Sequence, residues 1–253
     1  MMKNIYLSVV IPAYNESKNI KNGVLSQVYK YLSKQTYPWE VLIVDDASSD
    51  DTVFLVEKFI KDKKGFRLLR EPHRGKGGTV IAGVLASRGE YVLFTDMDQA
   101  TPLSEVEKFF PKFSKGYDVV IGSRKGREGA PFVRKMMAYG FQILRTVVLK
   151  LPYKDTQCGF KAFRKDAACR IFERMRVFRK GSSLKGASVT AGFDLEMLYI
   201  ARKIGLQVAE VAVNWKHKES KRVNPIKDSF EGFRDLLRVR MNAFLGKYKD
   251  YLD

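Results

Sequence analysis

Short apolar runs alternate along the chain with stretches of helical spacing. The apolar runs predict strands near residues 5–11, 39–45, 66–70, 90–95, 118–121 and 207–213, and the helical spacing predicts helices near 16–34, 50–62, 76–87, 103–113 and 192–204. Runs that are apolar on both faces are typical of parallel strands covered by helices. The alternation therefore predicts an α/β fold with a mostly parallel sheet and right-handed crossover connections.

Polar residues stand at the ends of three predicted strands. LSVVIPAYNE reaches Pro12 before a helix that begins near Glu16, VLIVDDASSDDT ends in Asp45 and Asp46, and YVLFTDMDQATP ends in Asp96 and Asp98. Because ligands of open α/β sheets bind at the carboxyl ends of the strands, we expect the three segments to meet at one crevice. Asp45 and Asp46 also fit a simpler interpretation as turn and helix-capping residues.

Asp96 and Asp98 are separated by one residue, so an extended backbone directs both carboxylates to the same side. Two carboxylates in that arrangement can hold a hard divalent cation, Mn²⁺ or Mg²⁺, and the cation can neutralise a diphosphate. A single Asp-x-Asp is also common in turns. The neighbouring strand ends favour the metal site, with Asp98 as ligand and Asp96 assisting.

Composition limits the number of domains and the kind of partner. The 253 residues are 45% hydrophobic, enough for one sizeable core, and Cys158 and Cys169 form neither a zinc motif nor a disulfide framework. Against 28 Asp and Glu residues, 46 Lys and Arg residues give a net charge of +18, which favours nucleic acid, phospholipid head groups or a phosphorylated substrate as partner. The basic residues gather in 124–151 and 216–249.

Two amphipathic helices are predicted in these basic regions, at Pro131–Leu151 and from Ile226 to Tyr248. Each combines an apolar stripe with several Lys or Arg residues, a pattern that fits either packing on the core or an anionic membrane interface. No signal sequence is evident at the start of the chain, and no apolar run approaches the ~20 residues that span a bilayer.

These features predict one domain at 1–224, with an amphipathic region at about 125–152, and a membrane-peripheral helix at 225–253. The simplest interpretation of Cys158 and Cys169 is that both are reduced thiols. We therefore expect a cytoplasmic protein that is peripheral to the inner face of the cell membrane.

The blocks RGKGGTVIAGVLASRGEYVLFTDMDQATP, VVIGSR and DTQCGFKAF resemble those of family 2 glycosyltransferases, which have the GT-A nucleotide-sugar fold. Within that family the chain is most similar to dolichyl-phosphate glucosyltransferases and mannose synthases, over roughly residues 5–230. The resemblance implies inverting transfer of a hexose from a UDP- or GDP-sugar to dolichyl or polyprenyl phosphate. It also implies that the domain at 1–224 is the GT-A catalytic domain and that the amphipathic region at about 125–152 lies on its acceptor side. Ala100, where the mannose synthases often place a polar ligand, favours glucose over mannose.

The resemblance also implies which residues bind the donor. They are Pro12, Tyr14, Glu16, Asp45, Asp46, Lys76, Asp96 and Asp98. An acidic side chain such as Asp46 can accept the imide proton of uracil or guanine. Lys76 lies among glycines near a helix start, where backbone N–H groups and an ammonium can bind phosphate, although a solvated loop lysine would look the same.

A lipid phosphate is already ionised, so it needs positive charge to hold it rather than a base. Arg124, Arg134 and Lys221 are the candidates for that role, and the last two could equally be surface cations. Asp155 and Asp194 are the carboxylates expected at the reacting centre. By resemblance the family's usual base lies near Asp194, and we favour Asp155 as closest to the nucleophile.

Two other functions remain open. A family 2 transferase acting on a soluble or growing glycan would need no membrane helix, and a basic nucleic-acid-binding module would show affinity that falls steeply with salt. The segment from Arg174 to Gly192 has little apolar periodicity and is expected to be a lid-like loop. His73 and His217 fit no triad or metal spacing, so structural or solvated roles are expected.

Overall fold

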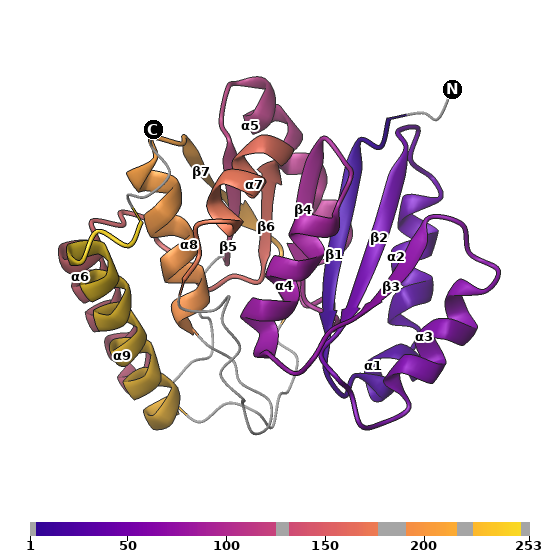
Figure 1. The fold of residues 1–253 in the computed structure, drawn as a ribbon, viewed down its shortest axis with the longest axis horizontal. Coiled ribbons are helices and arrows are strands. Elements are labelled where there is room, and N and C mark those ends of the chain that lie inside the picture. Colours follow the sequence, from indigo (N-terminus) through magenta and orange to yellow (C-terminus); the bar gives the residue numbers. More distant parts are fainter. Residues whose placement is uncertain (1–3, 125–131, 177–190, 217–224, 249–253) are drawn as a thin grey trace.

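The computed structural model describes residues 4–124, 132–176, 191–216 and 225–248, and its centre is a seven-stranded sheet of order β3-β2-β1-β4-β6-β5-β7 (Figure 1). The strands are β1 Leu7–Ala13, β2 Trp39–Asp45, β3 Phe66–Arg70, β4 Tyr91–Thr95, β5 Val119–Arg124, β6 Phe160–Arg164 and β7 Val208–Val213. All neighbours run parallel except β6, which is antiparallel to both β4 and β5. The predicted α/β class with a mostly parallel sheet is confirmed.

Helices cover both faces of the sheet. They are α1 Ser17–Lys21, α2 Val24–Leu32, α3 Thr52–Ile60, α4 Gly75–Ala86, the 3-10 helix η1 Leu103–Lys108, α5 Phe110–Ser114, α6 Phe132–Leu149, α7 Lys165–Phe172, α8 Ala191–Lys203 and α9 Pro225–Phe244. One core cluster joins the sheet to α4, α7 and α8, and a second joins the opposite face to α2, η1 and α5. Strand residues that alternate between the two clusters fix which face each helix covers.

Most predicted boundaries agree with the structure within two residues, and the differences have local causes. The helix expected at 16–34 is divided into α1 and α2 at Gly23, whose φ of +80° is a left-handed conformation that glycine adopts without strain. The helix expected at 103–113 is a 3-10 segment followed by a short α-helix. Strand β6 and helix α7 were not predicted, because FKAFRKDAACRIF carries five charged side chains among its apolar ones.

The two predicted amphipathic helices are present as α6 and α9, which lie side by side at one end of the molecule (Figure 1). Helix α9 also packs on α8, and its Leu236 and Val239 are fully buried there. Both helices leave large apolar side chains exposed: Met136, Tyr139, Ile143 and Val147 on α6, and Phe233, Leu237, Met241 and Phe244 on α9. Among the described residues, no helix combines the length and apolarity that crossing a membrane requires. The proposed division at residue 224 stays a prediction.

Candidate active site

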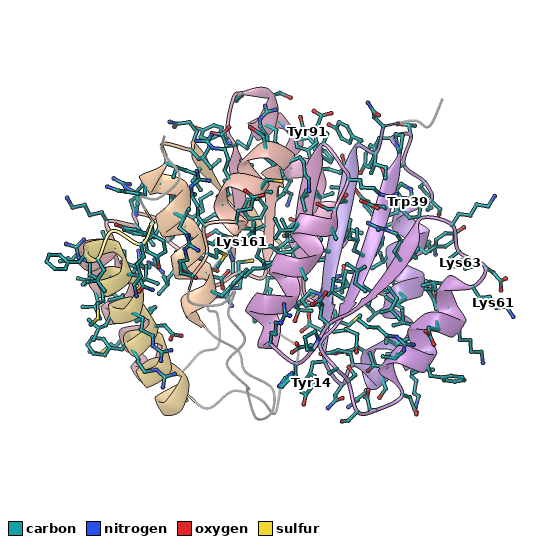
Figure 2. The ribbon with its side chains drawn as sticks, viewed as in Figure 1. Tyr14, Trp39, Lys61, Lys63, Tyr91 and Lys161 are labelled. Atoms are coloured by element: carbon teal, nitrogen blue, oxygen red, sulfur yellow. The ribbon has the colours of Figure 1, made fainter. Side chains whose placement is uncertain are left out.

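The carboxyl ends of β2, β1 and β4 lie next to one another at one edge of the sheet. Ala13 pairs with Asp45 in the parallel register, and the backbone N–H of Asp46 donates to the Ala13 carbonyl at 2.9 Å. Figure 2 places Tyr14 at this edge and Tyr91, at the start of β4, at the opposite edge. The three polar strand ends therefore meet, as their position after parallel strands predicts.

Asp45 and Asp46 are both buried but are bonded differently. Asp46 accepts hydrogen bonds from the backbone N–H groups of Arg74 at 2.7 Å and Gly75 at 3.0 Å, and its Oδ2 lies 2.9 Å from Nδ1 of His73. Asp45 accepts one from the Ser48 N–H at 3.1 Å through Oδ2. Its Oδ1 is buried with no hydrogen-bond partner in the described part of the chain, which marks it as an acceptor for a ligand.

The loop after β1 forms the wall of this end of the crevice. The ring of Tyr14 stacks on His73 with ring centroids 4.6 Å apart. Glu16 is anchored by its backbone N–H, which donates to Thr52 Oγ1 at 2.7 Å, while Pro12 lies within β1. His73 thus has the structural role expected of it, because it connects Tyr14 to Asp46.

Lys76, in the first turn of α4, points at the carboxylates that follow β4. Its Nζ lies 2.5 Å from Oδ1 of Asp96. Burial acts to lower the pKa of Lys76, but the negative charges of Asp96, Asp194 and Asp98 outweigh it, and the pKa is raised. The ammonium therefore stays charged beside the Asp-x-Asp pair.

A small pocket surrounds that pair, lined by Thr95, Asp96, Asp98, Ala100, Thr101, Gly159 and Trp215. Oδ1 of Asp98 accepts the Ala100 N–H at 2.9 Å, and Asp96 remains partly exposed. No group of three or more acidic, His or Cys side chains able to hold a metal occurs in the described ranges. Two carboxylates without a third are the donor set of a cation that takes its other ligands from water and substrate phosphates, so the residues present fit Mn²⁺ or Mg²⁺.

Gly159 is the residue that makes room for Asp96. A Cβ at this position would lie 2.1 Å from Oδ2 of Asp96, well inside van der Waals contact. Gly159 precedes Phe160, which pairs with Thr95 across β4 and β6, so the sheet register brings glycine and carboxylate together. Any larger residue would displace the Asp96 side chain.

Arg124, the last residue of β5, forms a bidentate ion pair with Asp155. Its Nε lies 2.6 Å from Oδ2 and its NH2 2.9 Å from Oδ1, and its guanidinium carbon is 5.6 Å from the ring centre of Trp215. Burial disfavours ionisation of Asp155, but the hydrogen bonds and charge of Arg124 prevail and hold its pKa below the usual range. The structure thus pairs two residues that the sequence indicated separately.

Two residues that contact the candidate site residues were not singled out from the sequence. Glu210 on β7 accepts the backbone N–H groups of Lys154 at 2.9 Å and Asp155 at 2.7 Å, which fixes the loop that carries Asp155. Lys161 on β6 is fully buried, and its Nζ lies 2.6 Å from Oδ1 of Asp194. The sequence around Lys161 mixes apolar and charged residues, as in a half-exposed strand, so the burial of this lysine could not be predicted from it.

Some expected residues are outside the described residues. Lys221, His217 and most of the loop from Arg174 to Gly192 belong to this group. The backbone of Arg134 lies in α6, but its side chain is not described. Their assignments stay predictions.

A sheet that brings paired carboxylates, a lysine and a buried acceptor to the carboxyl ends of its strands has the architecture of a nucleotide-sugar transferase of the GT-A class. The family described as Glycosyl transferase family 2 matches residues 8–172, and the chain belongs to this family. The range that matches the family therefore contains every carboxylate described above except Asp194 and Glu210, which come after residue 172.

Relatives cover nearly the whole chain. A dolichyl-phosphate beta-glucosyltransferase of Dictyostelium discoideum is 36% identical over 97% of this chain and 77% of its own length. Enzymes of the same name from Saccharomyces cerevisiae and Homo sapiens are 33% and 32% identical, over 98% and 96% of this chain and 78% and 77% of their own. The family-level resemblance read from the motifs is confirmed.

Solved structures give the fold. Mannosyl-3-phosphoglycerate synthase from Rubrobacter xylanophilus has a TM-score of 0.67 at 17% identity, over 96% of this chain and 75% of that chain. Glucosyl-3-phosphoglycerate synthase from Mycobacterium tuberculosis, in complex with Mn²⁺, UDP and glucosyl-3-phosphoglycerate, has a TM-score of 0.59 at 18% identity, over 94% and 80%. At such identities the similarity concerns the fold alone.

Proposed function

We propose that the protein transfers glucose from UDP-glucose to a dolichyl or polyprenyl phosphate, with inversion at the anomeric carbon. The observation that carries this proposal is the placement of Asp96, Asp98 and Lys76 beside the Arg124–Asp155 pair at the same edge of the sheet. Asp96, Asp98 and Lys76 suit the diphosphate of a donor. The Arg124–Asp155 pair suits an anionic acceptor. The names of the relatives supply the choice of glucose and of a dolichyl phosphate.

In the donor site, Asp45 is the acceptor we assign to the nucleobase. Its buried Oδ1 has no partner among the described residues, whereas both oxygens of Asp46 already accept hydrogen bonds from the 74–75 backbone or face His73. We therefore place the imide N–H of uracil on Asp45, and Asp46 holds the loop that precedes Lys76. A buried acceptor that gains its missing hydrogen bond favours a base with an imide, which includes guanine. Tyr14 and Glu16 stand beside it.

A divalent cation, Mn²⁺ or Mg²⁺, would be held by Asp98 with Asp96, and it would stabilise the charge that develops on the leaving diphosphate. Lys76 contributes positive charge at the same place and orients Asp96 through their 2.5 Å contact. Because the pKa of Lys76 is raised, this charge persists at neutral and mildly alkaline pH. The leaving nucleotide thus departs toward a positively charged lysine.

On the acceptor side, we assign Arg124 to the lipid phosphate. Arg has five N–H donors, and Asp155 engages Nε and one N–H of NH2, which leaves the others for phosphate oxygens. Asp155 therefore positions Arg124 near the nucleophile, and Glu210 in turn fixes Asp155. Arg134 and Lys221 remain candidate phosphate ligands. Since the phosphate oxygen attacks as an anion, no proton has to be removed from it.

The outer face of α6 and α9 supports a location at a membrane surface. Exposed apolar side chains of both helices lie beside Arg234, Arg238, Arg240 and Lys247 of the C-terminal region, all exposed. A face of this kind lies in the head-group region of an anionic bilayer, where each basic residue contributes about 1 kcal/mol. We propose peripheral binding to the cytoplasmic leaflet, with Arg124 within reach of the phosphate of an embedded lipid.

The test is transfer of radiolabelled sugar from UDP-glucose and, separately, GDP-mannose to polyprenyl phosphate in mixed micelles with Mn²⁺. The product is extracted into organic solvent. Label in the organic phase from UDP-glucose alone is the expected result. Label from GDP-mannose alone would overturn the choice of sugar, and donor hydrolysis with no organic label would overturn the lipid acceptor in favour of a soluble or growing glycan.

A further inference from the structure

Lys161 is a charged residue in a position that otherwise belongs to the core. Its side chain is 0% exposed, and no other lysine among the described residues is buried. It lies on β6, an inner strand of the sheet (Figure 2), where its register partners are Phe94 of β4 and Ile121 of β5, both fully buried. Burying an ammonium there is unfavourable unless it is paired and hydrogen-bonded.

The partners of Lys161 join two parts of the site. Its Nζ donates to the carbonyl of Cys158, which lies in the loop before Gly159, and to Oδ1 of Asp194 at 2.6 Å. The same Nζ lies 5.4 Å from the ring centre of Phe94. Asp194 is in the first turn of α8, so the lysine holds that helix end against the start of β6.

Asp194 is linked to the donor side through Lys161, which bonds the carbonyl of Cys158 next to Gly159, and Gly159 lies against Asp96. The negative charge of Asp194 also contributes to the raised pKa of both Lys76 and Arg124. Lys161 in turn influences Asp155 and Cys158. While Oδ1 of Asp194 is occupied by Lys161, its Oδ2 accepts no hydrogen bond from the part of the chain that the structure describes. That oxygen is therefore an acceptor left over beside Lys161.

We propose that Lys161 is a positioning residue, whose buried ammonium fixes Asp194 so that its second oxygen is directed at a hydroxyl of the donor hexose. This inference rests on the proposed function. Lys161 itself touches neither the nucleotide nor the phosphate of the acceptor. It acts through Asp194, and the fixed carboxylate orients the sugar for attack at the anomeric carbon.

The experiment is a double-mutant cycle with Lys161→Met and Asp194→Asn, in which kcat, KM for UDP-glucose and the affinity for UDP alone are measured on folded protein. Each single variant is expected to lower kcat by about 100-fold, the cost of misplacing a reacting group. UDP affinity should change by less than about threefold, because Asp45, Lys76 and the metal ligands are untouched. The double variant should be no slower than the worse single variant, because both changes break one interaction.

An ion pair with a buried carboxylate at the opposite edge of the sheet serves as the control. Glu40, which is 2% exposed, pairs with Arg88 at 2.9 Å, and the Arg88 side chain itself is 60% exposed. Arg88→Met should lower the melting temperature and leave kcat unchanged. Lys161→Gln, which keeps a donor for the Cys158 carbonyl, is the second variant in case methionine prevents folding, and the same loss of kcat is expected.

Wild-type kcat in either Lys161 variant would overturn the inference, as would additive losses in the cycle or a loss of UDP affinity equal to the loss of kcat. These outcomes presuppose an active wild type. If the wild-type protein transfers no glucose, the proposed function fails, and the inference about Lys161 falls with it. Failure of the inference alone is recognised by an active wild type with an equally active Lys161 variant.

Discussion

Replacing Gly159 by alanine should weaken the metal site while leaving the fold almost unchanged. The added Cβ would lie 2.1 Å from Oδ2 and 2.7 Å from Cγ of Asp96. Separation of two such atoms requires more than 1 Å of movement, since carbon and oxygen without a bond stay ~3.2 Å or more apart. Asp96 can make this movement by rotation, because its side chain is 41% exposed.

The rotation removes Asp96 from both Lys76 and the cation. Loss of one supporting group at a metal site typically weakens metal binding about 10- to 100-fold. We therefore expect the Mn²⁺ concentration for half-maximal activity to rise by about that factor, with kcat partly restored at saturating metal. The assay is glucose transfer titrated with Mn²⁺, together with thermal unfolding.

Gly116→Ala is the control, because Gly116 has a φ of +86° in a turn at the other edge of the sheet with open space around it. It should cost about 1–2 kcal/mol of stability from left-handed strain without changing the metal dependence. A Gly159→Ala enzyme with the wild-type Mn²⁺ requirement would refute the reasoning. So would an equal effect in Gly116→Ala.

Three further predictions concern other parts of the site. Asp98→Ala should abolish metal-dependent transfer, and full metal-dependent turnover in that variant would exclude Asp98 as a ligand. Because Arg124 lowers the pKa of Asp155, the ionised carboxylate stabilises the fold above its unfolded pKa of about 3.9, and this contribution is lost as the pH falls through the lower folded value. Urea unfolding between pH 5 and pH 2 should therefore show a smaller loss of stability in Asp155→Asn than in the wild type; equal slopes would contradict the pairing. Leu237→Asp with Met241→Asp should reduce sedimentation with phosphatidylserine vesicles at least about tenfold, whereas Phe54→Asp, an exposed aromatic on α3, should not, and equal losses in both would contradict a specific membrane face.

The fold could be predicted largely from local patterns. Strands β1, β2 and β4 are β-branched or aromatic runs buried on both faces, so their sequence identifies them without tertiary information. Strand β6 was not predicted, because Lys161 and Arg164 make its sequence resemble an exposed segment. Lys161 is buried and Arg164 is half-buried, and their partners are Asp194 and the Phe113 and Tyr117 carbonyls, which lie far away in the sequence.

Individual residues of the site could also be predicted from local motifs, whereas the contacts between them could not. Arg124 and Asp155 were each predicted from a motif, but their bidentate pairing joins residues 31 positions apart and is visible only once β5 and the following loop are placed. Asp45 and Asp46 were predicted together, and only the backbone geometry of residues 74–75 distinguishes the saturated carboxylate from the one with a spare oxygen. Glu210 lies in an ordinary strand with no motif, so no local signal could have indicated it.

The single antiparallel strand determines how far apart the two halves of the candidate site lie. Strand β6 is inserted between β4, which leads to the Asp-x-Asp pair, and β5, which ends in Arg124. Two inter-strand spacings of about 4.8 Å therefore separate these strand ends, about 10 Å in total. Under the proposed function, this distance is the room between the diphosphate of the donor and the phosphate of the acceptor, and the transferred sugar must fit within it.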